Sequence, residues 1–412
     1  MEVQVELDIP SADAAGRVFL TWTPVQATAR LAQADDASPV QVTLRGRSSG
    51  GRVQFATTRT HVGTPELQLT LPANGTKVSF FVAGVFGQPS KALDDGAVQV
   101  RVAGGAPVVA EKKVTVRIRK DATKMTGPER DRFLTALGTF NNRGTGRFRD
   151  FYEMHVSGTL DESHGNVGFL SWHRAYLLDL ERELQAIDPS VTLPYWRFDR
   201  AAPSLFTPAF LGRSDATGRV SFTPGHPLEG WRTAGVPGIT RAAGFPISQA
   251  PPGLRTENAT IALGGPAPNA QYGGFVAMEI NPHGFAHTSF TGLIRNPATS
   301  PRDPLFFLLH GNVDRLWAKW QWFHRRTDPA NPRAFAPALN NRIGHRLSDT
   351  MWPWNNNTAP PRPATAPGGT LAPSTVTTAP GPSPTVRSML DHQAVGGGAP
   401  LGFAYDDVPF EV

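Results

Sequence analysis

The chain has 412 residues, of which 40% are hydrophobic and 18% charged, so it can form two or three domains and bury a substantial core. It contains no cysteine, which excludes disulfides, thiolate metal sites, iron–sulfur clusters and cysteine nucleophiles. The net charge of +6 comes from scattered Arg and Lys residues without a long basic run. This pattern favours an evenly charged surface over nucleic-acid binding.

Targeting segments are not evident in the sequence. The first ten residues, MEVQVELDIP, lack the basic and apolar regions of a signal peptide. No stretch approaches the roughly 18 apolar residues of a membrane-spanning helix. We therefore expect a cytoplasmic protein without membrane association, with export alongside a partner as the alternative.

Short segments of alternating apolar and polar residues dominate the N-terminal region. They recur at Val3–Ile9, Val18–Trp22, Val40–Leu44, Val53–Thr57, Leu67–Leu71, Val78–Val82, Val98–Val102 and Val114–Ile118. Turn-forming sequences such as RSSGGR and PANG separate them. The pattern predicts an antiparallel β-sandwich over residues 1–122. Because no cluster of ionisable residues accompanies it, we expect a structural or assembly role.

The pattern changes near Thr126, where the sequence Thr-Gly-Pro-Glu is typical of a helix start. Helical periods follow at Phe133–Phe140, Arg147–His155, Trp172–Ile187 and Pro304–Arg325. Residues 200–280 are rich in Gly and Pro, and we expect them to form loops that wall a site. The fold class is therefore α+β and multidomain, with a mainly α-helical domain over residues 123–405 and a short tail at 406–412.

A Pro-, Thr-, Ala- and Gly-rich stretch covers residues 355–386 of this second domain. Its composition is typical of an extended linker. We expect it to act as a lid or to pack on a neighbouring subunit in a homo-oligomer, with a simple solvated linker as the alternative.

Six of the 11 histidines fall into two groups: His155, His164 and His173, and then His283, His287 and His310. His173 shares an apolar helix face with Leu177 and Leu180, and the i, i+4 spacing of His283 and His287 directs both imidazoles to one point. A lone buried histidine is usually just hydrogen-bonded to its neighbours. Six together have more polar atoms than neighbours can satisfy, so the pattern predicts metal sites in the core of a four-helix bundle.

The residue types narrow the choice of metal. All-imidazole sites suit Zn, Cu, Fe or Ni. His283-Gly-Phe-Ala-His287 lacks the Glu of the zinc-hydrolase motif HExxH, and the Glu-x-x-His pairs of di-iron bundles are absent. Neutral imidazoles tolerate both Cu(I) and Cu(II), and two coppers together can deliver two electrons to dioxygen. Two copper ions are the preferred cofactor, with dioxygen as co-substrate.

Two long segments resemble the copper-binding signatures of the tyrosinase family, which includes catechol oxidases and, more distantly, haemocyanins. They are FLSWHRAYLLDLERELQ (Phe169–Gln185) and DPLFFLLHGNVDRLWAKWQ (Asp303–Gln321). LPYWRFD (193–199) is similar to the family's PYW segment, and LDHQAVGGGAPLGFAYD resembles the motif that usually closes the catalytic domain. The likeness covers about residues 125–405. It implies that the first histidine group holds one copper and the second group the other.

The resemblance also implies roles for three further residues. Asp314 matches the family's carboxylate that orients a ligand imidazole, the alternative being an ion pair with an Arg. Phe306 matches an aromatic residue over the second copper, the alternative being a core Phe. Glu279 resembles the Glu that holds a water beside the substrate hydroxyl, the alternative being a solvated loop Glu.

Three departures from the family pattern stand out. The absence of Cys excludes the thioether Cys–His link of some relatives. Leu309 stands where relatives usually carry an extra His. Gly284 follows His283 at a position where many strong monophenol hydroxylases have Asn, which puts monophenol hydroxylation in doubt.

The resemblance implies a phenol oxidase that uses dioxygen to ortho-hydroxylate monophenols and to oxidise o-diphenols to o-quinones. Its substrates would be phenols such as tyrosine, DOPA and catechols. A catechol oxidase acting only on o-diphenols is the first alternative, and Gly284 favours it. The others are a dioxygen-binding protein resembling haemocyanin and a binding module in which the metal is only structural.

Overall fold

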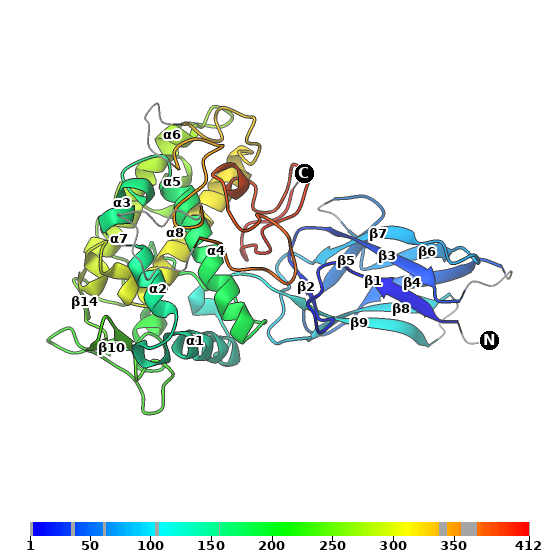
Figure 1. Cartoon of the computed structure of the whole chain (residues 1–412), viewed down its shortest axis with the longest axis horizontal. Helices are drawn as coiled ribbons and strands as arrows, with labels where there is room; N and C mark the ends of the chain where they lie inside the picture. Colours follow the sequence, from blue (N-terminus) through cyan, green and yellow to red (C-terminus); the bar gives the residue numbers. More distant parts are fainter. Residues whose placement is uncertain are drawn as a thin grey trace. The chain divides into compact units, whose positions relative to one another are not determined.

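The computed structural model describes residues 3–33, 38–60, 63–103, 107–155, 157–337, 344–355 and 369–411. The chain divides into two units (Figure 1). Unit 1 comprises Met1–Ile118, Ser374–Ala379 and His392–Val412, and unit 2 comprises Arg119–Pro373 and Pro380–Asp391. Both C-terminal segments of unit 1 thus lie within or after the region that the sequence assigned to the helical domain.

Unit 1 contains two sheets that form the predicted sandwich. The first has the spatial order β1 (Val5–Asp8), β3 (Val25–Leu31), β7 (Val78–Gly84), β5 (Val53–Ala56). The second has the order β2 (Val18–Leu20), β9 (Val108–Val116), β8 (Gly96–Val102), β4 (Val40–Gly46), β6 (Glu66–Leu71). Within the described residues every pair is antiparallel except β2 with β9, which run parallel.

The alternating residues of these strands fill the space between the sheets. Leu44, Phe80, Val98 and Val114 are fully buried, whereas their polar neighbours along each strand face outward. The sequence analysis missed one strand, β3, whose sequence VQATARL does alternate. Its inward positions include Ala27 and Ala29, which are buried. Alanine has a low strand propensity and is only slightly more hydrophobic than the outward residue between these positions, so the alternation was not recognised.

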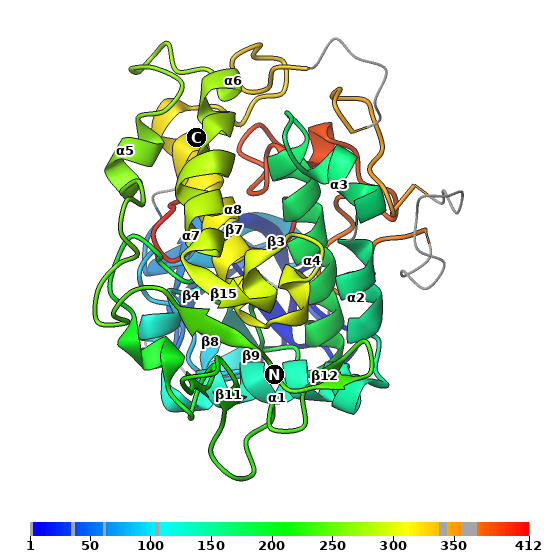
Figure 2. The same ribbon diagram turned by 90° about the vertical axis from the view of Figure 1, so that its left-hand side faces the viewer.

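Unit 2 is mainly helical, as predicted. Its helices are α1 (Gly127–Asn141), α2 (Phe148–Met154), α3 (Ser157–Ser163), α4 (Phe169–Ile187), α5 (Glu257–Ile261), α6 (Tyr272–Phe275), α7 (Phe285–Thr288) and α8 (Leu305–His324). Helix α1 begins at the predicted place, because Thr126 and Glu129 cap each other's backbone N–H groups. Helices α4 and α8 pack side by side (Figure 2). None of the described helices is long and apolar enough to span a membrane.

The Gly- and Pro-rich region between α4 and α8 consists mostly of loops, as its composition predicted. Its strands are short antiparallel pairs: β10 (Arg213–Ser214) with β11 (Val220–Ser221), β12 (Arg232–Thr233) with β13 (Val236–Pro237), and β14 (Arg241–Ala243) with β15 (Phe290–Gly292). Residues 356–368 of the Pro-rich stretch lie outside the described residues. Its lid role stays a prediction.

Candidate metal centre

The two predicted histidine groups form two triads in unit 2. Their positions are the end of α2 for His155, the residue after α3 for His164, α4 for His173, a π-helical turn (Ile280–Gly284) for His283, α7 for His287 and α8 for His310. In each triad the three ligand nitrogens lie within 4.8 Å of one another. The rings of His164 and His283 are 6.2 Å apart between centroids, so the two triads are neighbours.

Backbone carbonyls fix the orientation of four of the imidazoles. The acceptors are Pro297 O for His155 (2.9 Å), Phe169 O for His173 (2.8 Å), Glu279 O for His283 (2.8 Å) and Ile294 O for His287 (2.7 Å). A carbonyl oxygen can only accept, so each of these Nδ1 atoms carries the proton and donates it. Each Nε2 is therefore left with a lone pair, which is what a metal ion needs.

The free Nε2 atoms point at one another. His310 Nε2 lies 3.2 Å from Nε2 of both His283 and His287, and His155 Nε2 lies 3.3 Å from His173 Nε2. A single N–H on His310 can satisfy only one of its two neighbours, so at least one close contact joins two lone pairs. A cation among these atoms removes that repulsion, and the side chains present therefore fit a metal in each triad.

Burial keeps the six imidazoles neutral. Loss of solvation lowers the pKa of His155 to about 3 and that of His287 to about 4. Desolvation, reinforced by the neighbouring histidines, also holds the pKa of the other four imidazoles well below the ordinary value. Neutral imidazole is the form that coordinates metals. Three neutral imidazoles per ion, with neither thiolate nor carboxylate, suit copper in either oxidation state.

Glu279 lies at the junction of the two triads. Its backbone carbonyl holds His283, and its carboxylate accepts a hydrogen bond from the backbone N–H of Gly165 at 2.6 Å, next to His164. Burial raises the pKa of Glu279 to about 7. It is therefore a half-buried group at the candidate centre and not a solvated loop residue.

Phe306 packs against ligand rings from both triads. It stacks on His310 with ring centroids 4.1 Å apart and meets His155 edge-on at 5.0 Å. Its exposed fraction is 0%, because α8 turns this side chain into the core. The side chain therefore supports ligand imidazoles, and its expected position over the second copper stays a prediction.

Asp314 forms ion pairs with arginines, which was the alternative role considered in the sequence analysis. Its carboxylate accepts hydrogen bonds from Arg174 Nε at 2.5 Å and from Arg119 Nη1 at 3.1 Å, and all three side chains are buried. The Nδ1 atom of His310, one turn earlier in α8, has no hydrogen-bond partner. The ion-pair role is therefore present, and the role of Asp314 in orienting a ligand imidazole stays a prediction. The carboxylate helps to neutralise two buried guanidinium groups.

Gly284 faces open space. A β-carbon built there would meet only Glu279 O, at 3.4 Å. The position therefore has room for a larger side chain next to the backbone of Glu279.

Sequence reasoning missed the groups that orient the ligands. Pro297 and Ile294 act through backbone carbonyls, which every residue possesses, so no side-chain pattern could identify them. It also missed Asn281, which ties the π-helical turn to a loop through Arg255 and Gly253. An Asn beside a ligand histidine was the available signal, but its partners are distant in sequence.

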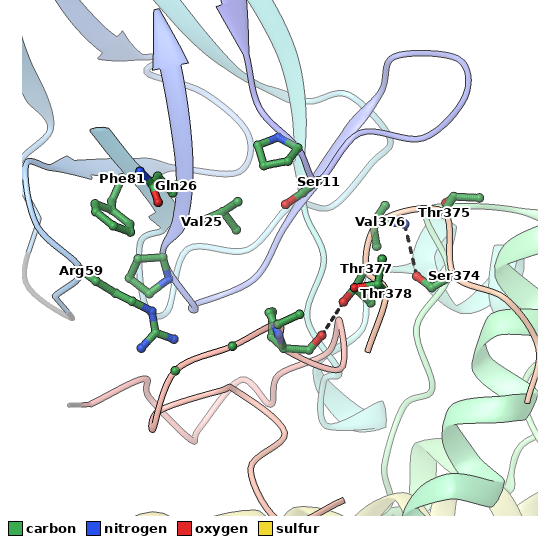
Figure 3. A pocket seen from close by; sticks show the side chains of 16 residues that line it. Ser11, Val25, Gln26, Arg59, Phe81, Ser374, Thr375, Val376, Thr377 and Thr378 are labelled. Carbon is green, nitrogen blue, oxygen red and sulfur yellow. Dashed lines mark hydrogen bonds between the residues drawn. The ribbon is translucent and has the colours of Figure 1, made fainter. Parts of the chain in front are cut away.

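Unit 1 has a separate hollow of about 560 Å³ (Figure 3). Ser11, Gln26, Phe81 and residues 374–378 are among the groups that line it. Arg59 is its only ionisable lining side chain, and it donates to the carbonyls of Ala394 and Val395. The hollow therefore lacks the clustered titratable groups seen in the histidine centre.

Comparison with known proteins adds a family context to this geometry. The family described as the common central domain of tyrosinase matches residues 145–323. The tyrosinase of Streptomyces antibioticus is 33% identical over 265 residues, which cover 58% of this chain and 94% of that protein. The tyrosinase of Streptomyces glaucescens is 34% identical over 263 residues, covering 58% and 93%.

Two further similarities are weaker. Grixazone synthase of Streptomyces griseus is 29% identical over 307 residues, covering 59% of this chain and 95% of that protein. Among solved structures, a functional unit of octopus hemocyanin is similar with 19% identity and a TM-score of 0.46, covering 71% of this chain and 69% of that one.

Proposed function

The chain belongs to the tyrosinase family of type 3 copper proteins, and we propose that it uses dioxygen to ortho-hydroxylate monophenols and to oxidise o-diphenols to o-quinones. The observation that carries this proposal is the pair of triads, in which the Nε2 atoms of four imidazoles are left with lone pairs and converge with those of their neighbours. Six neutral imidazoles in two adjacent sets are the donors that a pair of copper ions requires.

Each triad would hold one copper. His155, His164 and His173 form the first set, and His283, His287 and His310 form the second. When bound, the copper pair supplies the redox chemistry by which dioxygen accepts two electrons at a time. The protein contributes fixed imidazole orientations, through the four backbone carbonyls, and a largely dry setting in which five of the six rings are buried.

Glu279 would receive the proton of the phenol through a water molecule. An unperturbed phenol has a pKa of about 10, so it needs a base to ionise near neutral pH. The hydrogen bond from Gly165 keeps the Glu279 carboxylate beside both triads. With a catechol the hydroxylation step is skipped, and Glu279 would accept one of the two hydroxyl protons through the same water.

Phe306 and its neighbours would keep the centre rigid. The stack of Phe306 on His310, whose Nδ1 has no partner, replaces the hydrogen bond that fixes the other ligands. The role is positional, because the side chain is fully buried.

A catechol oxidase that acts only on o-diphenols is the second candidate. Gly284 favours it, since this position has no amide side chain that could help to orient the water. Phenolic substrates are common to both candidates. The cytoplasmic location and a homo-oligomer stay predictions.

Copper-loaded protein assayed with L-tyrosine and L-DOPA under air separates the candidates. Turnover of both substrates supports the hydroxylating activity. Turnover of L-DOPA alone makes the protein a catechol oxidase. Failure to oxidise 4-tert-butylcatechol as well would contradict both and leave a haemocyanin-like dioxygen carrier or a binding module with a structural metal.

A further inference from the structure

Two large apolar side chains are exposed beside the second triad. Ile280, which follows Glu279 directly, is 73% exposed, and Phe285, which follows Gly284, is 43% exposed. They bracket His283 along the π-helical turn and the start of α7. Because exposed apolar groups gain free energy when a ligand covers them, the pair offers a surface for the apolar part of a substrate.

A loop that carries a cation lies against the same rim. The Asn281 side chain accepts from Arg255 N at 2.7 Å and donates to Gly253 O at 3.0 Å, while the Arg255 guanidinium donates to the Asn281 carbonyl. A β-carbon at Gly253 would lie 3.5 Å from the Phe285 ring. The loop is therefore attached to the turn that presents His283 and passes close to Phe285.

The charge of Arg255 is not compensated by a carboxylate. It forms no ion pair with any residue that the structure describes. Glu257, two residues further along the chain, is already paired with three cations: Arg197, Arg315 and Lys319. Asp199, which accepts a hydrogen bond from Glu257 N, is paired with Arg197. The guanidinium at the rim is therefore available to a negatively charged ligand group.

We propose that Ile280, Phe285 and Arg255 form a specificity rim that selects phenols and catechols whose ring substituent is an apolar spacer ending in a carboxylate. The inference rests on the proposed phenol oxidase function and adds the substrate class. The apolar pair covers the spacer, and Arg255 attracts the carboxylate. A substituent ending in an ammonium group meets the same apolar surface but is repelled by the guanidinium.

Three catechols with para substituents of similar size test the rim: 3-(3,4-dihydroxyphenyl)propionate, dopamine and the neutral 4-ethylcatechol. With copper-loaded wild-type protein we expect kcat/KM for the propionate to exceed that for dopamine by about tenfold, equivalent to ~1.4 kcal/mol. Arg255→Met should lower kcat/KM for the propionate and raise it for dopamine, whereas Arg255→Lys should retain the preference. Arg213→Met, which removes one exposed cation elsewhere in unit 2, should leave the ratio at the wild-type value.

The opposite movements of the two charged substrates distinguish recognition from a structural role. A uniform loss for all three substrates in Arg255→Met would show that the residue only holds the loop, and would overturn the proposal. An unchanged propionate-to-dopamine ratio would overturn it as well, while continued 4-ethylcatechol turnover would leave the phenol oxidase function standing. A wild-type protein that oxidises none of the three would instead contradict the phenol oxidase function itself. The proposed specificity rim would then be contradicted too, because it rests on that function.

Ile280 gives a second, independent readout of the rim. Ile280→Ser should raise KM for 4-butylcatechol more than for unsubstituted catechol, since only the longer substrate reaches the apolar surface. Equal changes in KM for both substrates would contradict an apolar contact at this position.

Discussion

The Nε2 atoms of His283 and His310 lie 3.2 Å apart, while Nδ1 of His283 already donates to a backbone carbonyl. His287 Nε2 lies at the same distance from His310 Nε2, so three ring nitrogens meet where at most one proton is available. The arrangement is costly without a cation and favourable with one. Backbone carbonyls thus hold the proton of four imidazoles on Nδ1 and leave their Nε2 atoms free before a metal ion binds.

Copper should therefore stabilise the folded protein. We expect the apo-protein to have a lower Tm than the copper-loaded form, because a ligand that binds only the folded state shifts unfolding by mass action. The copper-dependent rise in Tm should shrink in His310→Ala and persist in His226→Ala, a buried histidine outside both triads. Thermal scans with and without copper measure both differences. An equal rise in the two variants would argue against binding at the triad.

Loss of a ligand from the first triad should abolish activity. His173→Ala is expected to bind about one copper per chain and to lose catechol oxidation by at least about a hundredfold, because a single metal cannot replace the pair. Metal analysis and oxygen uptake with 4-tert-butylcatechol measure the two effects. Retained activity in His173→Ala would contradict the assignment of this triad as the ligands of a catalytic copper.

Gly284→Asn should shift the balance toward monophenols. The position has open space, so the new side chain fits without displacing the backbone and places an amide beside Glu279. We expect the ratio of L-tyrosine to L-DOPA turnover to rise about tenfold, which is less than a whole general base contributes because the Asn only assists Glu279. In a Glu279→Gln background the gain should vanish. A gain of the same size without Glu279 would show that the Asn acts by another route.

Asp314 should matter for stability more than for metal binding. Asp314→Ala leaves Arg119 and Arg174 buried with one carboxylate fewer, which costs about 3–5 kcal/mol in the free energy of unfolding. Urea unfolding of apo-protein measures this loss, and copper titration of the folded variant should still give two ions per chain. A variant with wild-type stability but weakened copper binding would contradict this prediction and support a role for Asp314 in orienting a ligand imidazole.

Asp179 predicts a specific pH dependence of stability. Burial raises its pKa from the ordinary value of 3.8 to about 6, despite hydrogen bonds from Trp354 Nε1 and Ala372 N, both at 2.8 Å. The folded state therefore keeps a proton that the unfolded state loses, so the free energy of unfolding falls as the pH rises from about 4 to about 6, by up to ~3 kcal/mol. Above that range the contribution is constant.

The comparison with Asp179→Asn isolates this contribution. The variant carries no ionisable group at the position, so its stability relative to the wild type should improve between pH 4 and pH 7. Urea unfolding at both pH values gives the difference, in which the titration of all other groups cancels. A difference that is independent of pH would contradict the raised pKa.

Much of this architecture follows from local sequence patterns. Period-2 alternation located eight of the nine strands in the two described sheets, and the exception, β3, presents Ala where other strands present larger residues. The helices α1, α2, α4 and α8 lie where 3.6-residue periods predicted them. Sequence spacing grouped the six histidines into two sets, and the four-residue spacing of His283 and His287 predicted that these two imidazoles converge.

The remaining features depend on contacts between segments distant in sequence. Asp314 is four residues after His310, which suits either a ligand-orienting or an ion-pair role, and only the positions of Arg119 and Arg174 reveal the ion pairs. Phe306 faces the core because of how α8 packs, which its sequence offset from His310 cannot show. Contacts across the loops, such as Arg255 with Asn281, leave no periodic signal.

The most direct test of the central claim is the copper content of the purified protein measured together with oxygen consumption on L-DOPA. The two triads predict two copper ions per chain and oxidation of L-DOPA that stops when a chelator removes the metal. One metal ion per chain, or two coppers without any catechol oxidation, would contradict a dinuclear phenol oxidase centre.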